Sequence, residues 1–218
     1  MIYYAGIGSR ETPQEVLDGF QSIGTILAKR GYCLRSGRAD GADKSFEIGC
    51  DKVNGRKEIY LPWKGFNGSS SNLFVGNLQK EAEAISIASK YHPAWDRCKD
   101  GAKKLMQRNT YQVLGQDLET PSDFVICYTD RGLEKGGTAQ AIRIAKDNNI
   151  PIFNVGNYCI YENNTVMLNK EICNKAFKEF IYNVEHNKNF VEDGKGVQTW
   201  QKECCYWIIY LQDVVIVH

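Results

Sequence analysis

The sequence predicts an α/β protein built on a doubly wound parallel sheet in three layers. Short apolar runs alternate along the chain with amphipathic segments of helical period, as expected of repeated β-α-β units. Three glycine-rich turns lead from apolar runs into helical patterns, at residues 6–10, 36–43 and 136–140. Crossover connections between parallel strands are right-handed, so we expect one sheet covered by helices.

Composition limits the classes of function. The 218 residues are 43% hydrophobic, enough for one α/β domain with a single core. The net charge of +1 is too small for a dedicated duplex-DNA-binding protein. Eight cysteines show no CxxC pair and no histidine at ligand spacing, so we expect free thiols, no metal, no cofactor and a cytoplasmic location. No signal peptide or membrane-spanning run is visible, and we expect no membrane partner.

The first sixty residues predict three strands and two helices. Ile2–Ile7 is a buried strand, and Thr12 is expected to cap the next helix, with Pro13 at its first position and Glu15 at its third. Lys29–Gly31 ends that helix with cations followed by glycine. The next expected elements are a strand at 32–35, a helix from about residue 39, and a strand at 58–61.

A glycine- and serine-rich segment then interrupts the alternation. Residues 62–77 predict a mobile surface loop beside the strand ends, where ligand sites of α/β proteins form. The elements expected after it are helices at 78–90 and 95–114, a strand at 123–128, a polar loop at 129–135, a helix at 137–148 and a strand at 151–155. We place this nucleotide-binding domain at residues 1–158.

Residues 159–218 follow a different pattern and are expected to form a C-terminal extension. Residues 170–184 predict an amphipathic helix, and 186–196 a polar linker. The apolar, β-prone run at 204–217 fits no β-α unit. An added edge strand pair, a homodimer contact and a non-native extension remain open for it.

The turn after the first strand is a candidate phosphate loop. Gly8, Ser9 and Arg10 stand where a strand passes into a helix. Free backbone N–H groups and the helix dipole favour an anion at such a junction, and an arginine fork suits phosphate. The alternative is a tight turn with Arg10 paired on the surface.

The second turn carries Ser36, Gly37, Arg38 and Asp43. Ser36, Arg38 and Asp43 are candidates to contact the ribose or base of a nucleotide. Asp43 at a helix start is also explained by the helix dipole alone, which we favour for that residue.

The third turn joins Gly136, Gly137 and Thr138 to a helix after the fourth strand. Its N–H groups should point to the strand ends, although Thr138 is also a candidate helix cap. Arg108 and Asn109 precede the fourth strand and are candidate ligand-binding residues, with a solvated helix face as the alternative.

A fourth group lies between the helices expected at 78–90 and 95–114. His92 and Asp96 suggest acid–base chemistry, and Trp95 could stack on a base. Because His-Pro-x-Trp also serves as a capping and packing motif, we favour the structural interpretation.

Together these motifs resemble the DprA/Smf family and, more widely, the SLOG superfamily of Rossmann-like proteins, which includes the LOG phosphoribohydrolases. The matching stretches are Ile7-Gly8-Ser9-Arg10-x-Thr12-Pro13, Ser36-Gly37-x-Ala39-x-Gly41-x-Asp43, Arg108-Asn109 and Gly137-Thr138-Ala139. The resemblance covers about residues 1–155. It implies a Rossmann-like nucleotide-binding fold and a nucleotide or nucleotide-derived ligand.

Two further functions follow from the resemblance as alternatives. DprA proteins bind single-stranded DNA, although this chain is less basic. LOG enzymes hydrolyse the N-glycosidic bond of nucleoside monophosphates with a glutamate that follows their glycine-rich turn. Here Ala139, Gln140 and Ala141 follow Thr138, and a glutamine cannot act as a general base. Glu134 is left as a weak catalytic candidate, and enzymatic activity is undecided.

Overall fold

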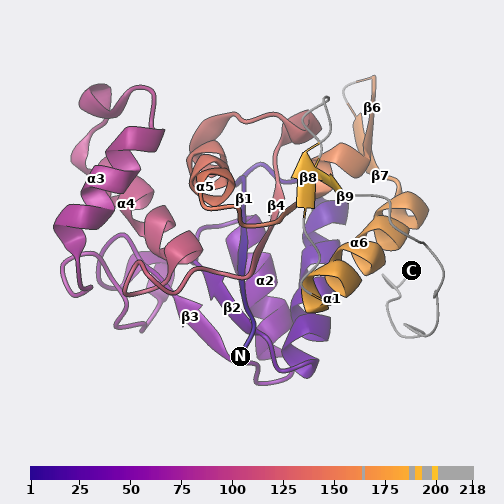
Figure 1. Ribbon diagram of the computed structural model, residues 1–218, viewed down its shortest axis with the longest axis horizontal. Coiled ribbons are helices and arrows are strands. Elements are labelled where there is room, and N and C mark those ends of the chain that lie inside the picture. The colour runs from indigo at the N-terminus through magenta and orange to yellow at the C-terminus, as the bar shows by residue number, and fades with distance from the viewer. Residues whose placement is uncertain (164, 187–189, 193–197, 201–218) are drawn as a thin grey trace.

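The centre of the computed structural model, which describes residues 1–163, 165–186, 190–192 and 198–200, is a five-stranded sheet (Figure 1). Its strands are β1 (Tyr3–Gly8), β2 (Cys33–Ser36), β3 (Lys57–Ile59), β4 (Phe124–Tyr128) and β5 (Ile152–Asn154). They lie in the order β3-β2-β1-β4-β5, and each neighbouring pair is parallel. The predicted doubly wound, Rossmann-like sheet is confirmed. Strands β2 and β3 are added on one side of β1, and β4 and β5 on the other. The order of the strands therefore reverses between β1 and β4, and ligands are expected at the carboxyl ends of these two strands.

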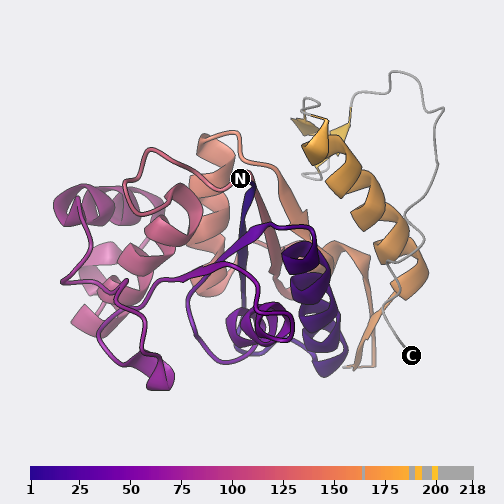
Figure 2. The same ribbon diagram turned by 90° about the horizontal axis from the view of Figure 1, so that it is seen from below.

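Helices cover both faces of this sheet (Figures 1 and 2). The helices are α1 (Gln14–Lys29), α2 (Ala42–Asp51), α3 (Glu81–Tyr91), α4 (Asp100–Leu114), α5 (Gly136–Asp147) and α6 (Lys170–Glu185). Helices α1, α2 and α6 pack on one face, and α4 and α5 pack on the other with α3 beside them. The result is the expected three-layer arrangement.

Alternation along the strands builds two different cores. Tyr4 and Phe124 point to the α1, α2 and α6 face, where Phe46 and other aromatic side chains gather. Their chain neighbours Ala5 and Val125 point to the α4 and α5 face, which is richer in aliphatic side chains. Strands buried on both faces read as continuous apolar runs, which explains the clear sequence signal of β1 and β4.

The capping prediction for the first helix is wrong. Pro13 is the N-cap residue of α1 and no side chain caps the helix. Thr12 instead donates from its hydroxyl to the carbonyl oxygen of Ser9 at 2.7 Å, which folds the β1–α1 turn. Glu15 is directed away from the cap, because it accepts from the Leu168 N–H at 2.8 Å and pairs with Lys170 at 3.1 Å.

Other elements differ from expectation in their extent. The helix expected at 95–114 is a short 3-10 turn, Trp95–Arg97, followed by α4 from Asp100. The loop at 62–77 contains a 3-10 turn, Phe66–Gly68, and buries Phe66. Segments without a predicted strand form the hairpin β6 (Cys159–Glu162) and β7 (Thr165–Leu168), and the pair β8 (Phe190–Glu192) and β9 (Gln198–Trp200). The apolar run at 204–217 lies outside the described residues.

The cysteines in the described part of the chain are free. Burial raises the pKa of the Cys33 thiol to about 11, so this side chain is a protonated, apolar packing group at neutral pH. Within the same residues, no cluster of metal-ligating side chains occurs, and no helix has the length and apolar character that a membrane span requires.

Candidate functional site

The strand-end site comprises the turns that follow β1, β2 and β4, at residues 8–10, 36–38 and 136–138. Gly8 pairs with Tyr128 of β4, which places the first turn at the reversal point of the sheet. A Cβ atom on Gly8 would lie 2.6 Å from the Cβ of Ala42, so only glycine allows α2 to approach β1 here.

Ser9 shapes the first turn and leaves Arg10 open to solvent. The Ser9 hydroxyl accepts from the Glu11 N–H at 3.0 Å, while its carbonyl accepts from the Thr12 hydroxyl at 2.7 Å. Arg10 is exposed and has no ion pair among the described residues. The guanidinium is therefore available for an anion at the strand ends.

Ser36 has a structural position. Its side chain is fully buried, and its hydroxyl donates to the carbonyl oxygen of Gly6 at 2.7 Å. This bond ties the end of β2 to β1 and leaves the hydroxyl no access to a ligand.

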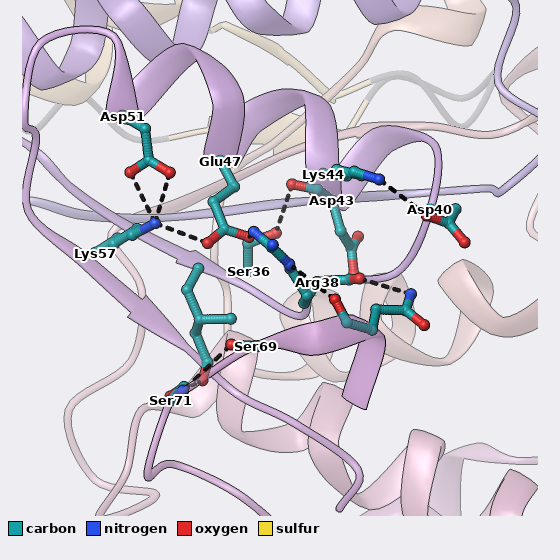
Figure 3. Close-up of polar contacts among 12 residues, drawn as sticks. Ser36, Arg38, Asp40, Asp43, Lys44, Glu47, Asp51, Lys57, Ser69 and Ser71 are labelled. Carbon is teal, nitrogen blue, oxygen red and sulfur yellow. Dashed lines mark hydrogen bonds and ion pairs between the residues drawn. The ribbon is translucent and has the colours of Figure 1, made fainter. Parts of the chain in front are cut away.

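Arg38 extends toward Glu47 of α2 (Figure 3). Its guanidinium pairs with Glu47 of α2 at 2.9 Å, and Lys57 pairs with the other oxygen of the same carboxylate at 2.7 Å. Asn67 donates to the carbonyl oxygen of Arg38 at 3.0 Å, which helps to hold its backbone at a positive φ of 60°. These contacts account for Arg38 without a ligand.

Asp43 and Arg108 form a buried ion pair that connects the first two turns to α4. The Arg108 guanidinium donates to the Asp43 carboxylate at 2.9 Å, and each side chain is 5% exposed. Burial raises the pKa of Asp43, while Arg108 and backbone hydrogen bonds from Ala39 and Gly8 act in the opposite direction. A Cβ atom on Gly37 would lie 1.2 Å from Nη1 of Arg108, so the guanidinium packs directly on this glycine.

Asn109 connects α4 to the third turn. Its amide donates to the carbonyl oxygen of Gly137 at 3.3 Å and to the Gln140 side chain at 3.1 Å. Gln140 in turn donates to the carbonyl oxygen of Met106 at 3.2 Å. Arg108 and Asn109, neighbours in the sequence, therefore reach different turns and do not form a solvated helix face.

The N-terminus of α5 completes the strand-end site. Lys135 is the N-cap residue, and no side chain hydrogen bonds to the N-terminal N–H groups. Gly136, at φ 70°, and Gly137 are exposed, whereas Thr138 lies third in the helix and does not cap it. Open N–H groups and the positive end of a helix dipole favour an anion at such a terminus.

The sequence reasoning did not single out Arg131. It follows β4 in the short turn Asp130–Gly132, has a positive φ of 53° and a side chain 64% exposed. Its N–H donates to the Tyr161 hydroxyl at 2.7 Å, and its guanidinium lies 5.1 Å from the centre of that ring. Its position directly after a strand that ends at the reversal point was the available signal.

Glu134 lies on the same loop but is held by cations of α5. Its carboxylate is 2.9 Å from Nζ of Lys146 and 3.5 Å from Nε of Arg143. These pairs fix the loop on α5 and account for the carboxylate without a catalytic role.

No protein-family model and no curated protein matches the chain. Similar solved structures include the molybdenum cofactor carrier protein from Chlamydomonas reinhardtii, 14% identical over 84% of this chain and 88% of that one, with a TM-score of 0.45. DNA processing protein A from Helicobacter pylori, described for its binding of single-stranded DNA, is 15% identical over 85% of this chain and 81% of its own, with a TM-score of 0.48. The assignment of a Rossmann-like fold rests on the sheet order and its parallel pairing.

Proposed function

We propose that the strand-end site binds a phosphate-bearing nucleotide or nucleotide-derived ligand, as a DprA-like member of the SLOG superfamily. The observation that carries the proposal is the uncapped, glycine-only start of α5 beside the reversal point between β1 and β4. A phosphate at this terminus accepts hydrogen bonds from the N–H groups of Gly137 and Thr138 and is attracted by the positive end of the helix dipole. Arg10 adds a charged donor from the first turn.

The remaining predicted residues have supporting roles in this proposal. Asp43 and Arg108 fix the first two turns relative to α4, and Asn109 fixes the third. Ser36 and Gly37 allow close packing between the strand ends and the helices. Arg131 is the second cation proposed to face the ligand.

The test places a carboxylate in the anion site without weakening the helix. Gly137 and Gly101 both stand second in their helices, α5 and α4, so Gly137→Asp and Gly101→Asp are matched variants. Aspartate near a helix start stabilises the helix by about 0.3–1 kcal/mol, so both variants should fold. We expect ribose 5-phosphate, measured by calorimetry, to bind the wild type and Gly101→Asp and to lose at least ~10-fold in affinity for Gly137→Asp. Equal affinity in all three proteins would contradict this placement of phosphate.

Chromatography of a nucleoside monophosphate after incubation separates binding from hydrolysis. The proposal is binding, because Gln140 is engaged with Asn109, and Glu134 with Lys146 and Arg143. We expect the nucleotide to be recovered intact. Release of free base would instead establish the N-glycosidase alternative. Binding of single-stranded DNA without any response to nucleotides would favour the alternative of single-stranded DNA binding.

A further inference from the structure

Helices α3 and α4 lie at one end of the molecule (Figures 1 and 2). Residues between the end of α3 and the start of α4 line a hollow. It is open to solvent and has a volume of about 460 Å³. Its wall includes His92, Pro93, Trp95, Asp96 and Arg97, and none of the residues of the strand-end site.

Two aromatic side chains and a hydrogen-bonded turn form part of the wall of this hollow. The His92 and Trp95 rings meet edge to face with centres 6.4 Å apart. Nδ1 of His92 accepts from the Ala94 N–H at 3.2 Å, so the neutral imidazole carries its proton on Nε2 as a donor. The Cys98 thiol donates to the carbonyl oxygen of Ala94 at 3.4 Å and closes the turn. The walls are thus held in place without a ligand.

Two basic side chains lie at the hollow, because Arg97 belongs to its wall and Lys103 contacts Trp95. Within the described part of the chain, no ion pair is made by the four basic side chains Arg97, Lys99, Lys103 and Lys104. Lys103 lies over the Trp95 ring, with Nζ 5.5 Å from its centre. At the other end of α3, by contrast, Lys80 pairs with Glu119. Asp96 and Asp100 only partly offset this local positive charge, which favours an anionic ligand.

We propose that this hollow is a second ligand site, which takes an aminopurine mononucleotide. The planar base packs against Trp95 and His92, and its exocyclic amine donates to the Asp96 carboxylate, the acceptor in the wall. The phosphate pairs with Arg97, the basic side chain in the wall. Aromatic contact holds the ring, and the positive charge of Arg97 selects the phosphorylated form over the nucleoside.

The site is independent of the proposed strand-end site, so the experiment begins with Gly137→Asp, in which binding at α5 is suppressed. Adenosine monophosphate is added while tryptophan fluorescence is excited at the red edge, where adenine does not absorb. Trp95→Phe and Trp63→Phe are compared in this background, because Trp63 is 40% exposed, lies near Gly101 and is not part of the wall of the hollow. We expect quenching that persists in Trp63→Phe and disappears in Trp95→Phe. Quenching that persists in Trp95→Phe, or no quenching in the Gly137→Asp parent, would overturn the proposal.

A second variant tests the phosphate contact by a readout that loss of structure would not produce. In the Gly137→Asp background, Arg97→Gln should weaken adenosine monophosphate binding about 10-fold in calorimetry and leave the weaker binding of adenosine unchanged. Equal loss for both ligands, or for neither, would contradict the assigned contact. Ribose 5-phosphate binding to the wild type reports the strand-end site separately, so failure of one proposal is distinguishable from failure of the other.

Discussion

At the scale of single residues, the strand-end site depends on one buried guanidinium. Arg108 lies on Gly37 and pairs with Asp43, which in turn receives the backbone N–H of Gly8. Nε of Arg108 is buried without a hydrogen-bond partner among the described residues. Much of its alignment therefore depends on Asp43 and on the absence of a side chain at residue 37.

A methyl group at residue 37 should displace this guanidinium. Gly37→Ala places Cβ 1.2 Å from Nη1, so we expect a loss of about 1–3 kcal/mol in the free energy of unfolding. Gly101→Ala is the control, because its Cβ meets only Trp63, at 4.0 Å, and alanine favours the helix by about 1 kcal/mol. Urea unfolding measures both, and equal stability of the two variants would show that Arg108 is not fixed by Gly37.

The ion pair itself should be strongly coupled. Asp43→Asn leaves the Arg108 charge buried without its counter-ion, which costs about 3–5 kcal/mol. Removing both charges in Asp43→Asn/Arg108→Met should recover part of that loss. A double-mutant cycle in urea measures the coupling, and strictly additive effects would contradict the pair as described.

At the scale of elements, the turn between α4 and β4 contains a pH-sensitive contact. The Asp117 carboxylate accepts from the Thr120 hydroxyl at 2.7 Å and from the N–H groups of Thr120 and Glu119 at 2.9 and 3.0 Å. These hydrogen bonds favour the charged form and lower the pKa of Asp117 to about 2 from its ordinary value of 3.8.

This contact predicts a specific acid dependence. Because the folded pKa is lowered, its stabilisation is complete above the unfolded pKa and is lost as the pH falls toward about 2. Asp117→Asn should therefore be less stable than the wild type at neutral pH, with the difference shrinking between about pH 4 and pH 2. Thermal unfolding across this range measures it; a difference that does not change with pH would refute the assignment.

The elements differ in how well the sequence alone predicts them. Strands β1 and β4 are buried on both faces, so continuous apolar runs identify them. Strand β2 is equally buried but includes Arg35 and Ser36, and the order of the three strands places three glycine turns together. The half-exposed hairpin β6–β7 lacks such a run, although it positions Arg131 through Tyr161. Contacts between residues distant in the sequence could not be predicted either. Ser36 donates a hydrogen bond to β1, and Arg38 pairs with Glu47 of α2. Spacing along the chain carries no information about such partners.

At the scale of the whole molecule, α6 is continuous with the aromatic core. The Phe180 ring lies 5.6 Å from that of Phe124 in β4 and 5.3 Å from that of Phe153 in β5, measured between centres. Phe177 lies 5.2 Å from Phe153 in the same cluster. The boundary predicted at residue 158 would remove these side chains from the face of the sheet that α1 and α2 cover only in part.

This packing predicts that α6 stabilises the whole fold rather than a separate extension. Phe180 is 5% exposed, so Phe180→Ala should cost about 3–5 kcal/mol and lower the single unfolding transition of the protein. Ile172, on the same helix but 56% exposed, provides the control, and Ile172→Ala should change stability by less than about 0.5 kcal/mol. If α6 folded as an independent unit, Phe180→Ala would instead leave the main transition in place and shift only a separate, smaller one. Calorimetry of the full chain distinguishes these results, because the loss of an aromatic contact to β4 and β5 must appear in the transition that melts the sheet.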